Sequence, residues 1–233
     1  MSDHCRTLED VRTLLQSCKD LDPQERMKFY DSWAQTYEKD SEMIHYRAPN
    51  LVVDYLDANY PGSPGGVQVL DVACGSGLVA KLMSKLGFRH FVGVDGSKGM
   101  LELAAKTGLY QDLRLALLGT QPLPADSGVF GLVVIIGALR AGFVPVSVLR
   151  ELCQAAKPGG YICMSRVEPK SESAANYRLS MERELQLMEE EGLWTQISTG
   201  DMDRYMMNVY NTYEETTEQY LRGTVYLYKR SVN

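Results

Sequence analysis

The sequence predicts an α/β fold with a mainly parallel sheet, preceded by a helical N-terminal segment. Three observations predict it. After residue 66, short apolar runs alternate with helical stretches, which is the pattern of strands joined by right-handed crossover helices. The run Leu132–Ile136 is entirely apolar, as in strands that are buried on both faces of a parallel sheet. The segment Pro61–Gly66 contains only proline, glycine and serine and therefore marks a boundary.

Three helices are expected before that boundary. Thr7 is a good N-cap for a first helix, whose apolar residues Val11, Leu14, Leu15 and Cys18 recur at helical spacing. A second helix starts after Asp22, because Pro23 and Glu25 complete a capping box with a proline at the first helical position. One face of this helix carries Tyr30, Trp33, Ala34 and Tyr37. A third helix begins near Pro49.

Strands and helices then alternate to the end of the chain. The expected strands are Val67–Val72, Phe91–Val94, Leu113–Leu118, Leu132–Ile136 and Tyr161–Val167. The expected helices are Leu78–Leu86, Lys98–Lys106, Val146–Ala156 and a long charged helix over Ser173–Glu191. Gly223–Tyr228 is a closing strand, and it should be antiparallel because no second crossover helix precedes it.

Composition and charge exclude several classes of protein. The chain has 233 residues and a net charge of −6, the wrong sign for general binding of DNA or RNA. No run of 18 apolar residues is present, so no membrane span is expected. The first residues lack the apolar core of a secretory signal. We therefore expect a cytoplasmic protein, with the nucleus also accessible, and no membrane partner.

The cysteines and histidines do not form a metal-binding pattern. Neither the five cysteines (Cys5, Cys18, Cys74, Cys153 and Cys163) nor the three histidines (His4, His45 and His90) have the spacing of zinc ligands. We expect reduced, buried thiols and no metal site.

A glycine-rich turn is the most informative stretch for function. The apolar strand before it carries Asp71 near its end and leads into Gly75 and Gly77, which open a helix. Glycines allow the backbone to approach a ligand closely, and ligands of open α/β sheets bind at this edge. Asp95 ends the next strand about 20 residues later, where an acid can bind both ribose hydroxyls.

Two cofactors fit these features. Gly75–Ala80 matches the pattern G-x-G-x-x-A of dinucleotide sites, so an NAD(P)-dependent oxidoreductase is an alternative. Three observations count against it. Asp71 would repel a pyrophosphate but accept an ammonium group, no second glycine turn is present, and the aromatic N-terminal helices could cover a small cofactor.

Several segments resemble the class I S-adenosylmethionine-dependent methyltransferases. They are Val69–Gly77, Gly93–Ser97, Pro122–Pro124, Lys157–Gly160 and Phe29–Tyr37. The resemblance implies a Rossmann-like seven-stranded sheet whose last strand is antiparallel, flanked by helices, with an N-terminal helical lid. It also implies S-adenosylmethionine as the cofactor, bound over strands one, two and four, and S-adenosylhomocysteine as the product.

The same resemblance assigns site residues. Gly75 and Gly77 would face the methionine part with Asp71 near its ammonium, Asp95 would bind the ribose, and the adenine would lie by Gly96 and Met100. The full expected cofactor set is Trp33, Tyr37, Asp71, Ala73, Gly75, Gly77, Asp95, Gly96, Ser97, Met100, Leu118, Gly119, Ile136 and Gly137. The loop Leu117–Gln121 lacks the family's usual acid, and Gly131 stands where the family has Asp.

The acceptor and the catalytic groups are less defined. Tyr37, His45 and Tyr205 are the candidate catalytic residues, and the acceptor is a small molecule or a protein. A non-catalytic protein that binds S-adenosylmethionine remains a further alternative. We expect a monomer with an N-terminal cap over residues 1–60 and a methyltransferase domain over 61–233. Residues 66–167 would form its cofactor half and 168–233 its substrate side.

Overall fold

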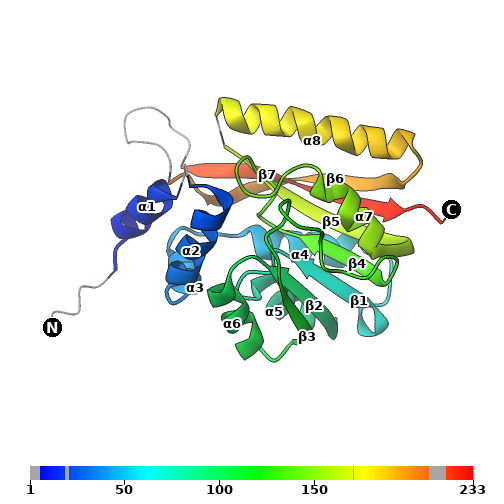
Figure 1. Cartoon of the computed structure of the whole chain (residues 1–233), viewed down its shortest axis with the longest axis horizontal. Coiled ribbons are helices and arrows are strands. Elements are labelled where there is room, and N and C mark those ends of the chain that lie inside the picture. Colours follow the sequence, from blue (N-terminus) through cyan, green and yellow to red (C-terminus); the bar gives the residue numbers. More distant parts are fainter. Residues whose placement is uncertain (1–5, 19–20, 170, 210–218, 233) are drawn as a thin grey trace.

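A seven-stranded sheet of order β3-β2-β1-β4-β5-β7-β6 runs through the part of the chain that the structure describes (Figure 1). The structure is a computed structural model and describes residues 6–18, 21–169, 171–209 and 219–232. The strands are β1 (Gln68–Val72), β2 (His90–Asp95), β3 (Tyr110–Leu115), β4 (Phe130–Ile135), β5 (Ala156–Glu168), β6 (Trp194–Met207) and β7 (Tyr220–Arg230). Strands β1 to β5 are parallel, whereas β7 is antiparallel to β5 and β6. The expected Rossmann-like sheet with an antiparallel closing strand is confirmed.

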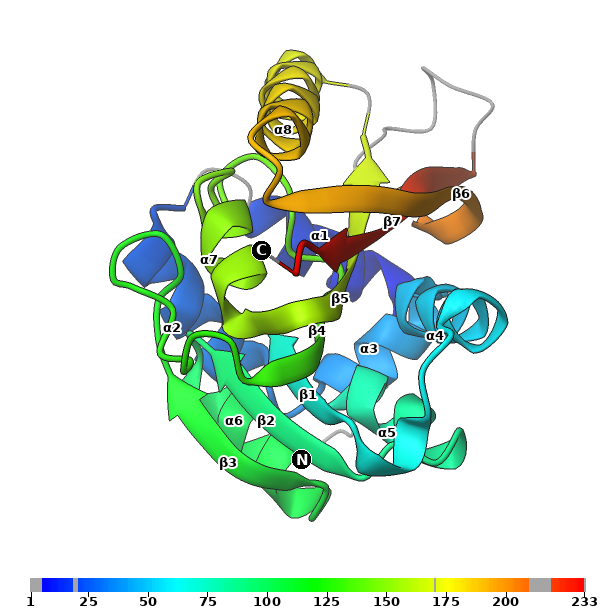
Figure 2. The ribbon, with the colours of Figure 1, turned by 90° about the vertical axis from the view of Figure 1, so that its right-hand side faces the viewer.

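The helices lie in two layers on this sheet. They are α1 (Leu8–Ser17), α2 (Pro23–Trp33), α3 (Tyr37–Met43), α4 (Ala48–Asn59), α5 (Leu78–Lys85), α6 (Lys98–Lys106), α7 (Val148–Ala155) and α8 (Glu172–Glu190), with a short 3₁₀ turn η1 (Pro64–Gly66). Figure 2 shows α4 and α5 on one side of the sheet and α7 on the other. Helix α4 packs against α5, β5 and β6, while α8 packs on β6 and α7. The helices α1, α2 and α3 lie at one end of the sheet (Figure 1).

Local sequence explains the two helices that follow β1 and β2. Gly77 begins α5 with a left-handed φ of 87°, and Gly87 follows the helix with a φ of 96°, so glycines permit both ends. Ser97 caps α6, because its hydroxyl accepts from the Met100 amide at 3.1 Å. The sequence predicted the bounds of both helices to within one residue.

The prediction of one helix through Tyr30 and Tyr37 is wrong, because α2 ends at Trp33 and α3 begins at Tyr37. The reason is a buried carboxylate. Asp40 is fully buried, and it accepts from Trp33 Nε1 at 2.7 Å and from Thr36 Oγ1 at 2.9 Å. These two hydrogen bonds hold the turn between the helices.

Three strands differ from the prediction. Strand β5 begins at Ala156 rather than at Tyr161, because Ala156 already pairs with Phe130 of β4 ahead of an irregularity in their pairing. Strand β3 occupies 110–115 rather than 113–118, because β2 ends at Asp95 and its pairing with β3 stops there, at Leu115. Strand β6 was not predicted. It pairs only with β7, at the edge of the sheet, and half of its residues are exposed, nearly all of them polar. An edge strand of this kind lacks the apolar run that identifies a buried strand.

No helix among the described residues has the length and apolar character needed to cross a membrane.

Candidate active site

A cavity of about 1120 Å³, including space open to solvent, lies at the carboxyl ends of β1, β2 and β4. Turns after the strands form its floor, with Ala73, Gly75, Asp95, Gly96, Ala116, Leu117, Leu118, Ile136, Gly137 and Ala138. Side chains from α2, α3 and β6 cover it, among them Met27, Tyr30, Trp33, Tyr37 and Tyr205. This is the edge at which open α/β sheets bind their ligands.

The turn after β1 leaves space for a ligand at one glycine. Gly75 has a φ of 55°, and a Cβ placed on it would meet no protein atom within 4 Å. Gly77, at the start of α5, is different, because a Cβ there would lie 3.2 Å from the Tyr110 ring. Ala73 also has a φ of 55°, a region that a residue with a Cβ enters at a cost. Gly75 thus faces the cavity, whereas Gly77 serves packing.

Asp95 joins the turns after β1 and β2. Its Oδ2 accepts from the Gly75 amide at 2.8 Å, and its Oδ1 accepts from the Ser97 amide at 2.9 Å. Burial raises the pKa of Asp95, while the amides of Ser97, Gly75 and Gly96 act in the opposite direction. The residue therefore holds the glycine turn in place and presents a carboxylate at the cavity wall.

Asp71 lies on β1 and is 1% exposed. Its Oδ2 accepts from the Tyr110 hydroxyl at 2.7 Å, and burial raises its pKa to about 7. The tyrosine reaches β1 across β2 at Gly93, where a Cβ would come within 2.9 Å of the Tyr110 ring. Asp71 is therefore a buried partner of Tyr110, and it is not among the residues that line the cavity.

Most of the cofactor residues expected from the sequence meet at this cavity. Trp33, Tyr37, Ala73, Gly75, Asp95, Gly96, Met100, Leu118, Ile136 and Gly137 line it. Four others lie outside its lining, namely Asp71, Gly77, Ser97 and Gly119. Ser97 caps α6 and donates its hydroxyl to Asp31 at 2.6 Å, and a Cβ on Gly119 would collide with Pro145.

The candidate catalytic residues separate into two groups. Tyr37 and Tyr205 line the cavity. His45 is exposed, and its Nδ1 lies 2.9 Å from the Tyr220 hydroxyl, outside the cavity lining. Burial raises the pKa of Tyr37 to about 12 and also raises the pKa of Tyr205. Both phenols are therefore neutral hydrogen-bond donors at physiological pH.

Several cavity residues were not predicted from the sequence. Arg26, Met27 and Tyr30 from α2 and Phe143 after β4 all line the cavity. Tyr30 lies three and four positions after Met27 and Arg26, which places the three residues on one side of the helix but does not show what that side covers. Phe143 lies between two guanidinium groups, with the Cζ atoms of Arg26 and Arg140 at 4.2 and 3.5 Å from its ring centre.

No group of three or more histidine, cysteine or acidic side chains within the described residues is arranged to hold a metal ion. Cys18, Cys74, Cys153 and Cys163 are buried free thiols. Cys5 and His4 lie outside the residues that the structure describes.

The chain is similar in sequence to known methyltransferases. A family profile described as "Methyltransferase domain" matches residues 70–164. Human methyltransferase-like protein 27 is 41% identical over 199 residues, which cover 85% of this chain and 80% of the human protein. The ubiquinone biosynthesis O-methyltransferase of Albidiferax ferrireducens is 30% identical over 162 residues. That match covers 64% of this chain and 61% of the bacterial enzyme, so the chain spans about three fifths of that relative.

Two solved structures share the fold. Magnesium protoporphyrin IX methyltransferase from Synechocystis, solved with bound S-adenosylhomocysteine, superposes with a TM-score of 0.56 at 16% identity and covers 84% of this chain and 87% of its own. Geranyl diphosphate C-methyltransferase from Streptomyces coelicolor gives a TM-score of 0.56 at 14% identity, with 84% and 85% covered. At such identities the likeness concerns the arrangement of helices and strands alone.

Proposed function

Because the chain belongs to the class I S-adenosylmethionine-dependent methyltransferases, we propose that it transfers the methyl group of this cofactor to a small-molecule acceptor inside the cavity. The observation that carries the proposal is the shape of the site. Helix α2, helix α3 and strand β6 all contribute side chains that cover the carboxyl edge of the sheet. A cavity covered in this way suits a cofactor with a small acceptor.

The residues at the cavity floor fit S-adenosylmethionine. Gly75 leaves open space where the methionine part would lie against backbone, and Asp95 offers a carboxylate for the ribose hydroxyls. Gly96 and Met100 would flank the adenine, and Ile136 would lie near the methyl end. Asp71 remains a proposed partner of the ammonium group, and its bond to Tyr110 implies that water would mediate the contact.

The cofactor supplies a methyl group that is already activated on a sulfonium centre. The chain must then position the acceptor and exclude water. Trp33 and Tyr37 stack edge to face, with ring centres 4.8 Å apart, and both line the cavity. Such aromatic walls displace water from the reacting atoms, while backbone turns fix the cofactor. No general base is required when the acceptor is itself a good nucleophile.

We also propose how the chain is divided into functional parts and in which cellular compartment it works. Residues 1–60 would act as a cap, 66–167 would bind the cofactor and 168–233 would shape the acceptor side. Four buried free thiols are typical of a reducing compartment such as the cytoplasm. We propose that the chain works there as a monomer, without bulk nucleic acid as a partner, as its net charge of −6 favours.

Transfer of labelled methyl groups tests the proposed acceptor class. The protein is incubated with methyl-labelled S-adenosylmethionine and a cell extract that is then divided into small molecules, proteins and nucleic acids. Label should accumulate in the small-molecule fraction and be absent with the Gly75→Val variant. Label confined to protein or nucleic acid would contradict the small-molecule proposal, and no transfer to any fraction would support a non-catalytic binding protein.

A further inference from the structure

Two tyrosines from distant parts of the chain meet at the turn after β4. Tyr46 follows α3 and Tyr205 lies on β6, and their ring centres are 5.9 Å apart with the planes at 65°. Both line the cavity. A Cβ on Gly137 would collide with the Tyr46 hydroxyl and would lie 3.3 Å from the Tyr205 hydroxyl. The absence of a side chain at Gly137 therefore lets two phenol oxygens approach the same point.

The backbone around both tyrosines is strained and mutually bonded. His45 and Arg204, the residues directly before them, have φ values of 50° and 52°, in the region that favours glycine. The pairing of β6 with β7 is irregular between Met202 and Met206, and such bulges redirect side chains. The Arg47 amide donates to the Tyr205 carbonyl at 2.9 Å. These features fix Tyr205 toward the cavity.

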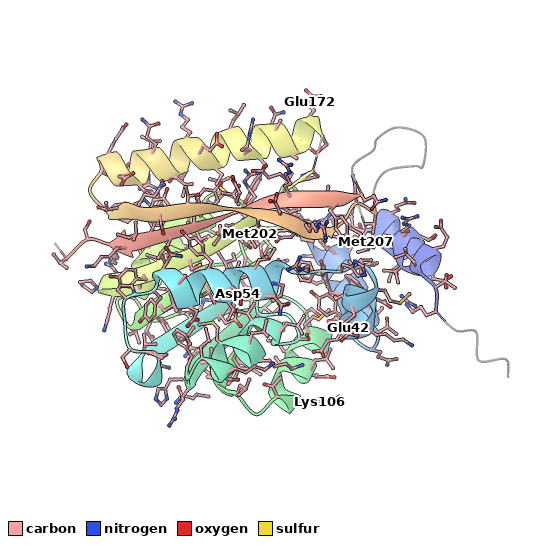
Figure 3. The ribbon with its side chains drawn as sticks, turned by 180° about the vertical axis from the view of Figure 1, so that it is seen from behind. Glu42, Asp54, Lys106, Glu172, Met202 and Met207 are labelled. Carbon is pink, nitrogen blue, oxygen red and sulfur yellow. The ribbon has the colours of Figure 1, made fainter. Side chains whose placement is uncertain are left out.

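A second bond joins the same two segments. The Met207 amide donates to the Ile44 carbonyl at 2.8 Å. Figure 3 shows Met207 at the end of β6 that lies beside the N-terminal helices, while Met202 lies further along the strand. The segment before α4 and the end of β6 thus form one rigid wall of the cavity.

The hydroxyl of Tyr205 is buried without a partner. The residue is 1% exposed, and its hydroxyl has no partner within ordinary hydrogen-bond geometry among the residues that the structure describes. The hydroxyls of Ser165 and Tyr46 are the polar neighbours close enough to act on its pKa. The Ser165 hydroxyl accepts from the Gly137 amide at 3.1 Å. Buried polar groups are normally satisfied, so an unpartnered donor that lines a cavity indicates a ligand atom that completes it.

The charges around this pair favour an oxygen with negative charge. Arg140 lies close enough to lower the pKa of both Tyr37 and Tyr205 against the larger effect of burial. Asp95 is the only acid among the described residues that line the cavity, and it ends β2, which β1 separates from β4. The part of the cavity at Gly137 therefore combines neutral hydroxyl donors with the Arg140 guanidinium, which also lines the cavity.

We propose that Tyr46 and Tyr205 are acceptor-binding residues whose hydroxyls hold a carboxylate or phenolic oxygen of a small molecule with an apolar body. This inference rests on the proposed function and narrows its acceptor to that chemical class. Leu15, Tyr30, Phe143, Val144 and Met206 supply the apolar walls of the cavity. A hydroxyl or carboxylate oxygen would give Tyr205 the partner that the protein itself does not supply.

Ligand-free stability gives the first test, because it needs no knowledge of the acceptor. Removing an unpartnered buried hydroxyl should not destabilise the fold, so Tyr205→Phe should unfold at the same temperature as the wild type or higher. Tyr228→Phe is the matched control, since the buried Tyr228 donates to Gln196 at 3.0 Å, and it should unfold at a lower temperature. Equal destabilisation of both variants would overturn the assignment and indicate a structural hydroxyl.

Probe binding gives the second test. Benzoate, phenol and toluene are titrated into the complex with S-adenosylhomocysteine and followed by ligand-detected NMR. Benzoate and phenol should bind about tenfold more tightly than toluene. Tyr205→Phe and Tyr46→Phe should each lower this preference for benzoate and phenol over toluene by about tenfold, whereas Tyr228→Phe should leave it unchanged. All three variants should bind S-adenosylhomocysteine like the wild type.

The outcomes separate this inference from the proposed function. Equal binding of the three probes to the wild type, or an unchanged preference in both cavity variants, would overturn the tyrosine site while cofactor binding stands. Failure of the wild type to bind S-adenosylhomocysteine would instead contradict the proposed function. An Arg140→Gln variant that weakens benzoate but not phenol would assign the charge preference to the guanidinium and the shared oxygen preference to the tyrosines.

Discussion

At the scale of single residues, Asp95 has the clearest predicted effect on the cofactor. Its carboxylate holds the Gly75 amide and lines the cavity. Replacing it by alanine removes charge-assisted hydrogen bonds to the ribose and loosens the glycine turn. We predict that Asp95→Ala weakens binding of S-adenosylhomocysteine by about 1.5–3 kcal/mol, measured by titration calorimetry.

The matched control is Asp112→Ala. Asp112 is an exposed acid on β3 that pairs with Arg114 at 2.6 Å, so its loss should leave cofactor affinity unchanged. Folded Asp95→Ala protein with wild-type affinity would show that this carboxylate does not contact the cofactor.

The buried Asp71 predicts a pH dependence of stability. Its folded pKa of about 7 lies above the value of about 4 in the unfolded chain, so the folded state holds this proton more tightly. The proton on Asp71 therefore adds to the unfolding free energy below about pH 4, and this contribution is lost as the pH rises toward 7. Asp71→Asn keeps an oxygen acceptor for Tyr110 but does not titrate.

The unfolding free energy of Asp71→Asn relative to wild type should therefore increase from about pH 4 to about pH 7 and stay constant above. Denaturant unfolding at a series of pH values measures this difference, in which other titrating groups cancel. Parallel stability curves for the two proteins would show that Asp71 is not protonated in the folded state.

Ala73 predicts a stabilising substitution in the site itself. Its φ of 55° is costly for a residue with a Cβ and free for glycine. Ala73→Gly should raise the unfolding free energy by about 1 kcal/mol. Ala105→Gly, on the exposed face of α6, should lower it by about 1 kcal/mol. If both substitutions destabilise alike, the left-handed conformation of Ala73 is not strained.

A site residue could be predicted from the sequence only where its neighbours in the sequence form a recognisable pattern. Gly75 and Asp95 belong to a local pattern in which strand, turn and acid follow each other in the sequence. Tyr205 was proposed only as an aromatic hydroxyl, since nothing near it in the sequence shows the bulge that turns it inward. Arg26 lies on a helix face of mixed polarity, so only its contact with the loop after β4 identifies it.

At the scale of elements, local signals again decide what is predictable. Helix α6 has a serine cap and an apolar face, and the sequence predicted its bounds at Lys98 and Lys106. Strand β6 has neither signal, because its neighbour β7 covers only one edge and solvent covers many of its side chains. The break between α2 and α3 depends on buried Asp40, whose partners lie on both sides of the turn.

We predict that the N-terminal helices form a lid that becomes ordered when the cofactor binds. Asp31 of α2 is hydrogen-bonded to the start of α6, where it accepts from Ser97 Oγ at 2.6 Å and from the Gly99 amide at 2.9 Å. Because few hydrogen bonds of this kind hold α2, the helix can open locally. Its closure over the cofactor would exclude water from the cavity. Hydrogen exchange should show a much larger gain in protection on binding S-adenosylhomocysteine in Phe29–Arg47 than in Leu132–Ile136.

Asp31→Ala sharpens this comparison, since it should speed exchange in α2 of the free protein and leave β4 unchanged. If Phe29–Arg47 and Leu132–Ile136 are equally protected without a ligand, α2 and α3 are fixed parts of the core and the lid does not exist.

At the scale of the whole molecule, the sheet assembles one site from segments that are far apart in the sequence. The proposed cofactor side comes from turns after β1 and β2, whereas the proposed acceptor side combines Tyr46, Gly137 and Tyr205, which all line the cavity. The order of strands explains why the first could be predicted, since β1 and β2 are neighbours in sequence and in space. The meeting of residues 46, 137 and 205 depends on tertiary packing that periodicity does not encode.

We propose that S-adenosylmethionine binds against Gly75 in the cavity under α2. Titration calorimetry with S-adenosylhomocysteine tests it most directly, using wild type, Gly75→Val and Gly128→Val. Both glycines have positive φ, and a Cβ at either would meet nothing within 4 Å, but only Gly75 lines the cavity. We predict one bound molecule per chain for wild type and Gly128→Val, none for Gly75→Val, and no binding of NADH. Wild-type affinity in Gly75→Val, or NADH binding in preference to S-adenosylhomocysteine, would contradict it.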